Sequence, residues 1–123
     1  MKGMRNMLRF VTAILLVLAV ASLAAAADIT GTLVDRHCSA KIAKEGQKAA
    51  QAHTLECALM PDCVAAGYAV YTTDNKLFIL DAAGNKTAEA ALRASQKKND
   101  LRVQVSGQVT GDSIKVATLK LLP

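Results

Sequence analysis

Short segments of β-branched or alternating apolar residues recur along the chain, and this pattern favours β-strands. The first covers residues 29–35. Residues 68–80 contain two apolar runs on either side of Thr73-Asp74-Asn75, which predicts a β-hairpin with an Asp-Asn turn. Residues 101–109 alternate strictly, and a turn at residues 110–112 leads into a second alternating run at 113–121. The pattern therefore predicts five short strands.

Helix-forming residues fill the remaining stretches. Residues 39–53 are rich in Ala, Lys, Gln and Glu, with Gly46 as the weak point, and Pro61 is expected to kink or end the run before a last turn closes at Gly67. A loop at 81–85 is expected to precede a second helix at 87–98. The order matches an OB-type barrel. We predict a mainly β fold with two helical segments: a five-stranded OB-like small barrel whose first strand is followed by a helical insert, residues 39–67.

The first 27 residues have a different character. They begin with three basic residues, Lys2, Arg5 and Arg9, and continue into an apolar run that ends in alanines. Ala25 and Ala27 form an A-x-A pattern, which is typical of a signal peptide cleaved after residue 27. A membrane anchor would need about 20 apolar residues, and the alanine-rich end is only weakly apolar. We predict a signal peptide at 1–27 and a periplasmic or secreted domain at 28–123, without membrane contact after signal removal.

Separating this segment changes the charge of the remaining chain. The whole chain carries 15 Lys and Arg against 10 Asp and Glu, and three of the basic residues lie in the predicted signal. The domain is therefore nearly neutral, and it contains few aromatic residues. These features exclude a nucleic-acid binder, which needs a basic groove and stacking platforms. We find no hydrolase, metalloprotease or phosphate-loop motif, and we expect no enzymatic activity.

All cysteine and histidine residues lie between Asp35 and Cys63. His53 and Cys57 are four residues apart, so they would share one face of the predicted helix. Cys63 follows Pro61 and can fold back toward them. We predict a tetrahedral site for Zn or a thiolate-preferring Cu ion, formed by Cys38, His53, Cys57 and Cys63. His37 is a weaker candidate ligand, because strand spacing would place it on the same face as Asp35.

A disulfide is the alternative use of these residues, because export permits one. Cys38, Cys57 and Cys63 allow three single pairings, each leaving one thiol free. Two functions stay open. The domain is either a small exported non-catalytic module that binds a ligand, an envelope partner or a thiophilic metal ion, or a disulfide-stapled structural or interaction module of the cell envelope with no metal.

Five sequence features together carry a resemblance to a known group. They are GTLVDRHC at 31–38, His53, CALMPDCVAAG at 57–67, YAVYTTDNKLFIL at 68–80, and VSGQVTGDSIKV at 105–116. This order resembles an uncharacterised family of small exported bacterial proteins with a Cys…His…Cys…Cys pattern and an OB-like barrel. The resemblance covers essentially the whole of residues 28–123. It implies that Cys38, His53, Cys57 and Cys63 act together, and it implies no activity. The layout is also similar to periplasmic bacterial OB-fold proteins associated with stress tolerance.

Overall fold

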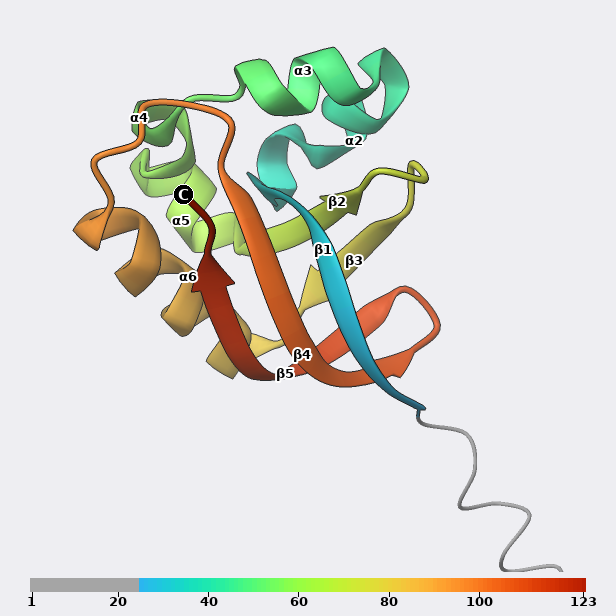
Figure 1. Cartoon of the computed structure of the whole chain (residues 1–123). Helices are drawn as coiled ribbons and strands as arrows, with labels where there is room; N and C mark the ends of the chain where they lie inside the picture. Colours follow the sequence, from blue (N-terminus) through green and yellow to red (C-terminus); the bar gives the residue numbers. More distant parts are fainter. Residues whose placement is uncertain (1–24) are drawn as a thin grey trace, which may run out of the picture.

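A closed five-stranded β-barrel forms the centre of the computed structural model, which describes residues 25–123 (Figure 1). The strands are β1 (Ala25–Asp35), β2 (Tyr68–Thr72), β3 (Leu77–Leu80), β4 (Arg102–Thr110) and β5 (Ser113–Leu121). Their order around the barrel is β1-β2-β3-β5-β4. Every neighbouring pair is antiparallel except β3 and β5, which run parallel. The predicted OB-like barrel with a helical insert after its first strand is confirmed.

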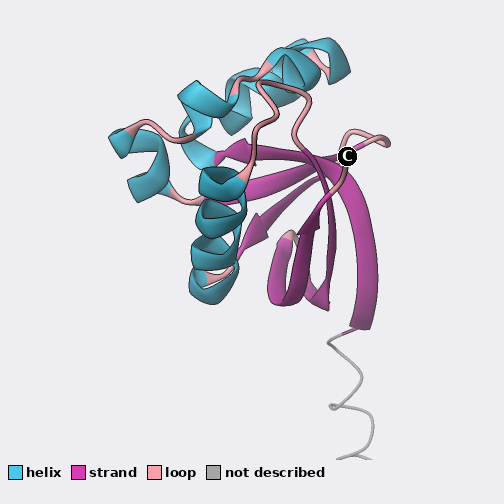
Figure 2. Cartoon of the chain, turned by 60° about the vertical axis from the view of Figure 1, so that its left-hand side comes forward, coloured by secondary structure: helices cyan, strands magenta, loops and turns pink. Residues whose placement is uncertain are grey.

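Two helical segments accompany the barrel. The insert between β1 and β2 consists of four helices, α2 (Arg36–Glu45), α3 (Gln47–Ala52), α4 (Leu55–Ala58) and α5 (Pro61–Ala66), and α6 (Ala82–Ala94) joins β3 to β4. Figure 2 shows the insert helices gathered at one end of the barrel, while α6 lies along its side. Among the described residues, no helix combines the length and the apolar character needed to cross a membrane.

Alternating residues of the strands fill the barrel interior. Val103 and Val105 of β4 and Leu33 of β1 are fully buried, and Leu92 of α6 packs into the same cluster. Burial of one such side chain contributes about 1.5–3 kcal/mol. A second apolar cluster, with Val34, Ile42, Ala50, Ala69 and Tyr71 as its buried members, lies between the insert and the outer face of β1 and β2. The insert is therefore packed onto the barrel.

Glycines end two helices of the insert: the end at Gly67 was predicted, whereas Gly46, expected only to weaken a single helix, divides it in two. Gly46 separates α2 from α3 at φ +96°, and Gly67 ends α5 at φ +87°. The predicted loop at 81–85 and the predicted end of the second helix are wrong. Helix α6 begins at Ala82, because Asp81 caps its first turn by accepting a hydrogen bond from the Gly84 amide at 3.0 Å. It ends at Ala94, because Ser95 adopts an extended conformation.

The first strand extends beyond the predicted range, which began at residue 29. Ala25 to Ala27 pair with Val109 to Gly107 of β4. Most of the predicted signal peptide, residues 1–24, lies outside the described residues. The last three residues before the predicted cleavage point thus form the outer end of β1.

Candidate functional site

The three cysteines occupy the same position in three helices of the insert. Cys38 is the third residue of α2, Cys57 the third of α4, and Cys63 the third of α5. At this position the backbone N–H has no partner within the helix, so the preceding capping residue supplies one. The acceptors are Asp35 Oδ2 for Cys38 at 2.8 Å, Thr54 Oγ1 for Cys57 at 3.1 Å, and the Met60 carbonyl for Cys63 at 2.9 Å. Capping therefore fixes the backbone of all three cysteines.

Asp35 is the residue on which the cluster is centred. It is the last residue of β1, it caps α2, and its side chain is completely buried. Its Oδ1 lies 2.7 Å from His53 Nε2, and neither of these two buried atoms has another partner among the described residues. The Cys63 sulfur lies within 4.8 Å of an oxygen of the same carboxylate. One carboxylate thus lies beside α2, α5 and the histidine between α3 and α4.

The charge of Asp35 is maintained despite its burial. Burial alone raises the pKa of a carboxyl group, because it penalises the charged form. The contacts with His53, the Cys38 amide and the Cys63 thiol outweigh that effect, and they lower the pKa of Asp35 to about 2. The site therefore holds a carboxylate at neutral pH.

The thiols lie close to this carboxylate and to one another. One oxygen of Asp35 and the sulfurs of Cys38 and Cys63 all lie within 4.8 Å of each other. Burial, reinforced by the negative charge of Asp35, raises the pKa of the Cys63 thiol to about 12. The pKa of the Cys38 thiol is also raised, by burial, by Asp35 and by the neighbouring Cys57. In the free protein Cys38 and Cys63 are therefore protonated thiols around a carboxylate.

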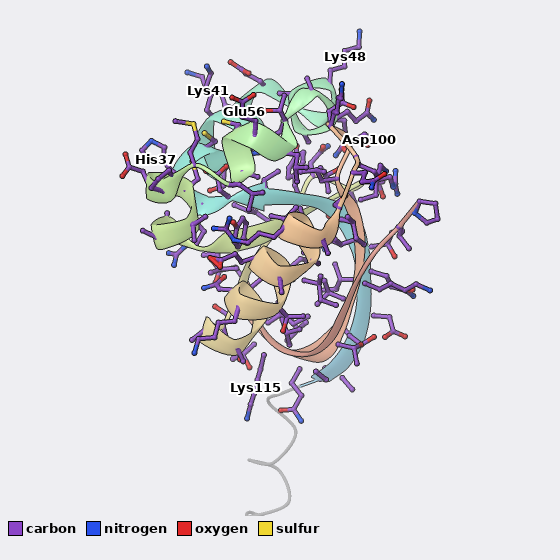
Figure 3. The ribbon with its side chains drawn as sticks, turned by 90° about the vertical axis from the view of Figure 1, so that its left-hand side faces the viewer. His37, Lys41, Lys48, Glu56, Asp100 and Lys115 are labelled. Atoms are coloured by element: carbon purple, nitrogen blue, oxygen red, sulfur yellow. The ribbon has the colours of Figure 1, made fainter. Side chains whose placement is uncertain are left out.

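The cluster lies at the edge of the insert rather than inside the barrel. Figure 3 shows sulfur atoms at the end of the molecule where His37, Lys41 and Glu56 are labelled. Cys38 and Cys57 are partly exposed, whereas Cys63 is buried. An ion or a small reagent can therefore approach Cys38 and Cys57 from solvent.

The structure brings Cys38 and Cys63 together at Asp35, whereas Cys57 is not part of this close group. Two expectations about the histidines are wrong. His53 and Cys57 do not share a helix, because His53 ends α3 in extended conformation and Thr54 begins α4. His37 does not share a strand face with Asp35. The strand ends at Asp35, so His37 lies in the first turn of α2, where it is exposed and directed away from the cluster (Figure 3).

No disulfide joins the cysteines, and all three are free thiols. The disulfide alternative named Cys38, Cys57 and Cys63 as candidates. No two of them are at bonding distance. The chain therefore folds with these residues gathered as separate thiols.

Asp35 is the site residue that periodicity did not identify as a ligand. The available signal was a capping pattern, since Asp and Thr are preferred N-cap residues and their side chains accept from the amide two or three residues later. Asp35-x-x-Cys38 and Thr54-x-x-Cys57 both follow this pattern, and it would have placed each cysteine in a first helical turn. Comparison with known proteins gives no match to a family model, a curated protein or a solved structure.

Proposed function

We propose that this protein is a small exported, non-catalytic domain that binds a thiophilic metal ion, Zn²⁺ or Cu⁺, at the cluster of Asp35, Cys38, Cys57 and Cys63. The observation that carries the proposal is the convergence of two free thiols, those of Cys38 and Cys63, on the buried Asp35 carboxylate. Thiolates are the protein ligands that zinc and Cu⁺ prefer.

Three of the four proposed donor atoms have a spacing that fits such an ion. Zinc takes four ligands in structural sites, with Zn–S bonds of about 2.3 Å, so two sulfurs on one tetrahedral ion lie roughly 3.8 Å apart. The 4.8 Å limit that encloses the Asp35 oxygen and two of the sulfurs is compatible with this spacing. Cys57 is not one of these three donors, and it would supply the remaining thiolate by moving toward them.

His53 has a different role in this proposal from the ligand role that its sequence position indicates. Its Nε2 faces Asp35 Oδ1 at 2.7 Å and is buried there. We infer that the imidazole orients the carboxylate, as outer partners of metal ligands commonly do. The primary ligand set is then three thiolates and one carboxylate.

Export is the other half of the proposal, and it rests on the sequence of residues 1–27. An exported chain would lack these residues, and the mass of the protein recovered from the periplasm or the medium would begin at Asp28. Recovery of the intact chain, or of a chain that begins elsewhere, would contradict the cleavage prediction. Loss of Ala25 to Ala27 removes only the outer end of β1, where the first two alanines are exposed.

Zinc content and affinity test the metal proposal. The protein, purified and kept reduced, should bind one Zn²⁺ per chain. Cys57→Ser replaces the thiol by a hydroxyl group of similar size. It should lower the zinc affinity more than about 100-fold, because loss of an outer partner alone costs 10–100-fold. Full zinc affinity in the Cys57→Ser variant would sink the proposal.

A matched variant separates ligand loss from general damage to the insert. Thr54→Ser retains the hydroxyl that accepts from the Cys57 amide and leaves every thiol in place. Its zinc affinity should equal that of the unmodified protein. If neither protein binds zinc or Cu⁺ and only one thiol of the unfolded chain is alkylated before reduction, the alternative function, a stapled envelope module, is the correct one.

A further inference from the structure

The residue that caps α5 is unusual for its position. Each cysteine of the insert is the third residue of its helix, and the three pairs of N-cap and cysteine are Asp35 and Cys38, Thr54 and Cys57, and Met60 and Cys63. Asp and Thr are preferred at an N-cap because their side chains accept a hydrogen bond from the helix, whereas methionine is not among the preferred residues. The Met60 side chain makes no capping hydrogen bond. Helix capping therefore does not explain the methionine at position 60.

Packing does not explain Met60 either. Met60 is 52% exposed, and within residues 25–123 no other large hydrophobic residue is exposed. Its backbone is held on both sides, because the Met60 amide donates to the Cys57 carbonyl at 3.2 Å and the Met60 carbonyl accepts from the Cys63 amide at 2.9 Å. Met60 thus has a fixed backbone and an accessible side chain directly before Cys63.

The backbone at Met60 places its sulfur within reach of Cys63. Asp35 and Met60 adopt the same extended conformation, with φ −78° and ψ 151° at Asp35 and φ −61° and ψ 143° at Met60. In the first pair, an Asp35 oxygen and the Cys38 sulfur lie within 4.8 Å of each other. The sulfur of methionine and the oxygens of aspartate are both two bonds from Cβ. Side-chain rotation can therefore bring the Met60 sulfur equally close to the Cys63 sulfur.

We propose that Met60 is a ligand for Cu⁺, which its thioether binds together with the thiolates of Cys38 and Cys63, and that Met60 thereby gives the site a preference for Cu⁺ over Zn²⁺. This inference rests on the proposed metal-binding function, and it names the preferred ion and one further ligand.

The chemistry of the two ions separates their ligand sets. Thioether and thiolate sulfurs are soft ligands that suit Cu⁺, whereas a carboxylate oxygen suits harder ions. Zinc in proteins takes thiolate, imidazole and carboxylate ligands. With Zn²⁺ the Asp35 carboxylate is therefore a ligand, and with Cu⁺ the Met60 sulfur takes its place. The thiols of Cys38 and Cys63 lose their protons on binding either ion.

Paired affinity measurements test the preference. The Cu⁺ and Zn²⁺ affinities are measured at one pH by competition with chelators, for the reduced protein and for Met60→Leu, which removes the sulfur and nearly conserves the apolar volume. Met60→Leu should bind Cu⁺ at least about tenfold more weakly, because loss of an outer partner alone costs 10–100-fold. Its zinc affinity should be unchanged, and this is the control for damage to the insert. An unchanged Cu⁺ affinity, or an equal loss of affinity for both ions, overturns the proposal.

X-ray absorption at the selenium edge tests the contact itself. The chain contains four methionines, Met1, Met4, Met7 and Met60. When these are replaced by selenomethionine, the Cu⁺-loaded protein should show copper bound directly to selenium, and the zinc-loaded protein should show no bound zinc at selenium. Labelled, Cu⁺-loaded Met60→Leu should lose the copper–selenium contact. A contact that persists in Met60→Leu, or the absence of a contact in the unmodified protein, contradicts the assignment of Met60.

Binding of the two ions also separates this inference from the function on which it rests. A reduced, correctly folded protein that binds neither Zn²⁺ nor Cu⁺ contradicts the metal function itself, and with it this inference. A protein that binds Zn²⁺ but not Cu⁺, or one whose Met60→Leu variant binds both ions as tightly as the unmodified protein, contradicts the role of Met60 alone.

Discussion

At the scale of single residues, Asp35 has a role both in the folding of the insert and in the proposed metal site. It ends the first strand, caps the first helix of the insert and faces His53, all while completely buried. A buried charge without partners would be costly, and this one is stabilised by the Cys38 amide, the imidazole and the Cys63 thiol. The same residue therefore serves folding and the proposed metal site.

The low pKa of Asp35 makes the stability of the protein dependent on pH. An unfolded chain has the ordinary value of 3.8, and the folded protein has a value of about 2. Stabilisation from this carboxylate is fully present above pH 3.8 and is lost as the pH falls through about 2. Its total is about 2 kcal/mol. Metal-free Asp35→Asn should therefore unfold about 2 kcal/mol more easily than the unmodified protein at pH 7, with a smaller difference at pH 3, in urea titrations.

Asn is as good an N-cap residue as Asp, so this substitution removes the charge rather than the cap. Asp81→Asn is the matched control, because Asp81 caps α6 without a histidine partner. It should cost less than about 1 kcal/mol at pH 7. An Asp35→Asn variant as stable as the unmodified protein at pH 7 would show that the charge of Asp35 beside His53 contributes nothing to stability.

At the scale of secondary-structure elements, hydrophobic periodicity predicts the strands, whereas capping residues set the limits of the short helices. The strands could be predicted because alternation is strong where one face is buried, as at Leu101, Val103 and Val105. The short helices of the insert could not be predicted from periodicity, because helices of four or six residues complete too few turns to show a repeat. Their limits are set by single capping residues, and the expected single helix through His53 and Cys57 fails for this reason.

Gly67 and Gly46 allow the role of these helix ends to be measured. Both adopt a positive φ with an extended ψ, a conformation that is open to glycine and costs other residues about 1–3 kcal/mol. A Cβ at Gly67 would also lie 2.7 Å from Asn85 Nδ2, whereas one at Gly46 would meet no atom within 4 Å. The Asn85 side chain accepts a hydrogen bond from the buried Tyr68 amide at 2.9 Å. Gly67→Ala should therefore destabilise the protein by about 1–3 kcal/mol more than Gly46→Ala in thermal or urea unfolding.

Two outcomes of the unfolding measurements on Gly67→Ala and Gly46→Ala would contradict this prediction. Equal losses of stability in the two variants would mean that Asn85 moves away without cost and that it does not fix the start of β2. A Gly46→Ala variant as stable as the unmodified protein would mean that the break between α2 and α3 does not depend on the glycine conformation.

At the scale of the whole molecule, a barrel supplies the rigid part and the insert supplies the chemistry. The barrel could be predicted from strand count and order, since few topologies close five short strands with a helix between the third and fourth. The grouping of the cysteines could be predicted in outline, because every cysteine lies in or beside one short insert. The central position of Asp35 could not, because only the fold shows that the end of β1 faces both α5 and the chain between α3 and α4.

The X-ray absorption spectrum of the zinc-loaded, reduced protein tests the proposed site most directly, because it reports the atoms bound to the ion. The proposal predicts three sulfur ligands at about 2.3 Å and one oxygen ligand at about 2.0–2.2 Å. His53→Gln, which removes the imidazole, should leave these four ligand atoms and their distances unchanged. A shell without sulfur, or one in which an imidazole replaces a sulfur or the carboxylate oxygen, would contradict the proposed ligand set.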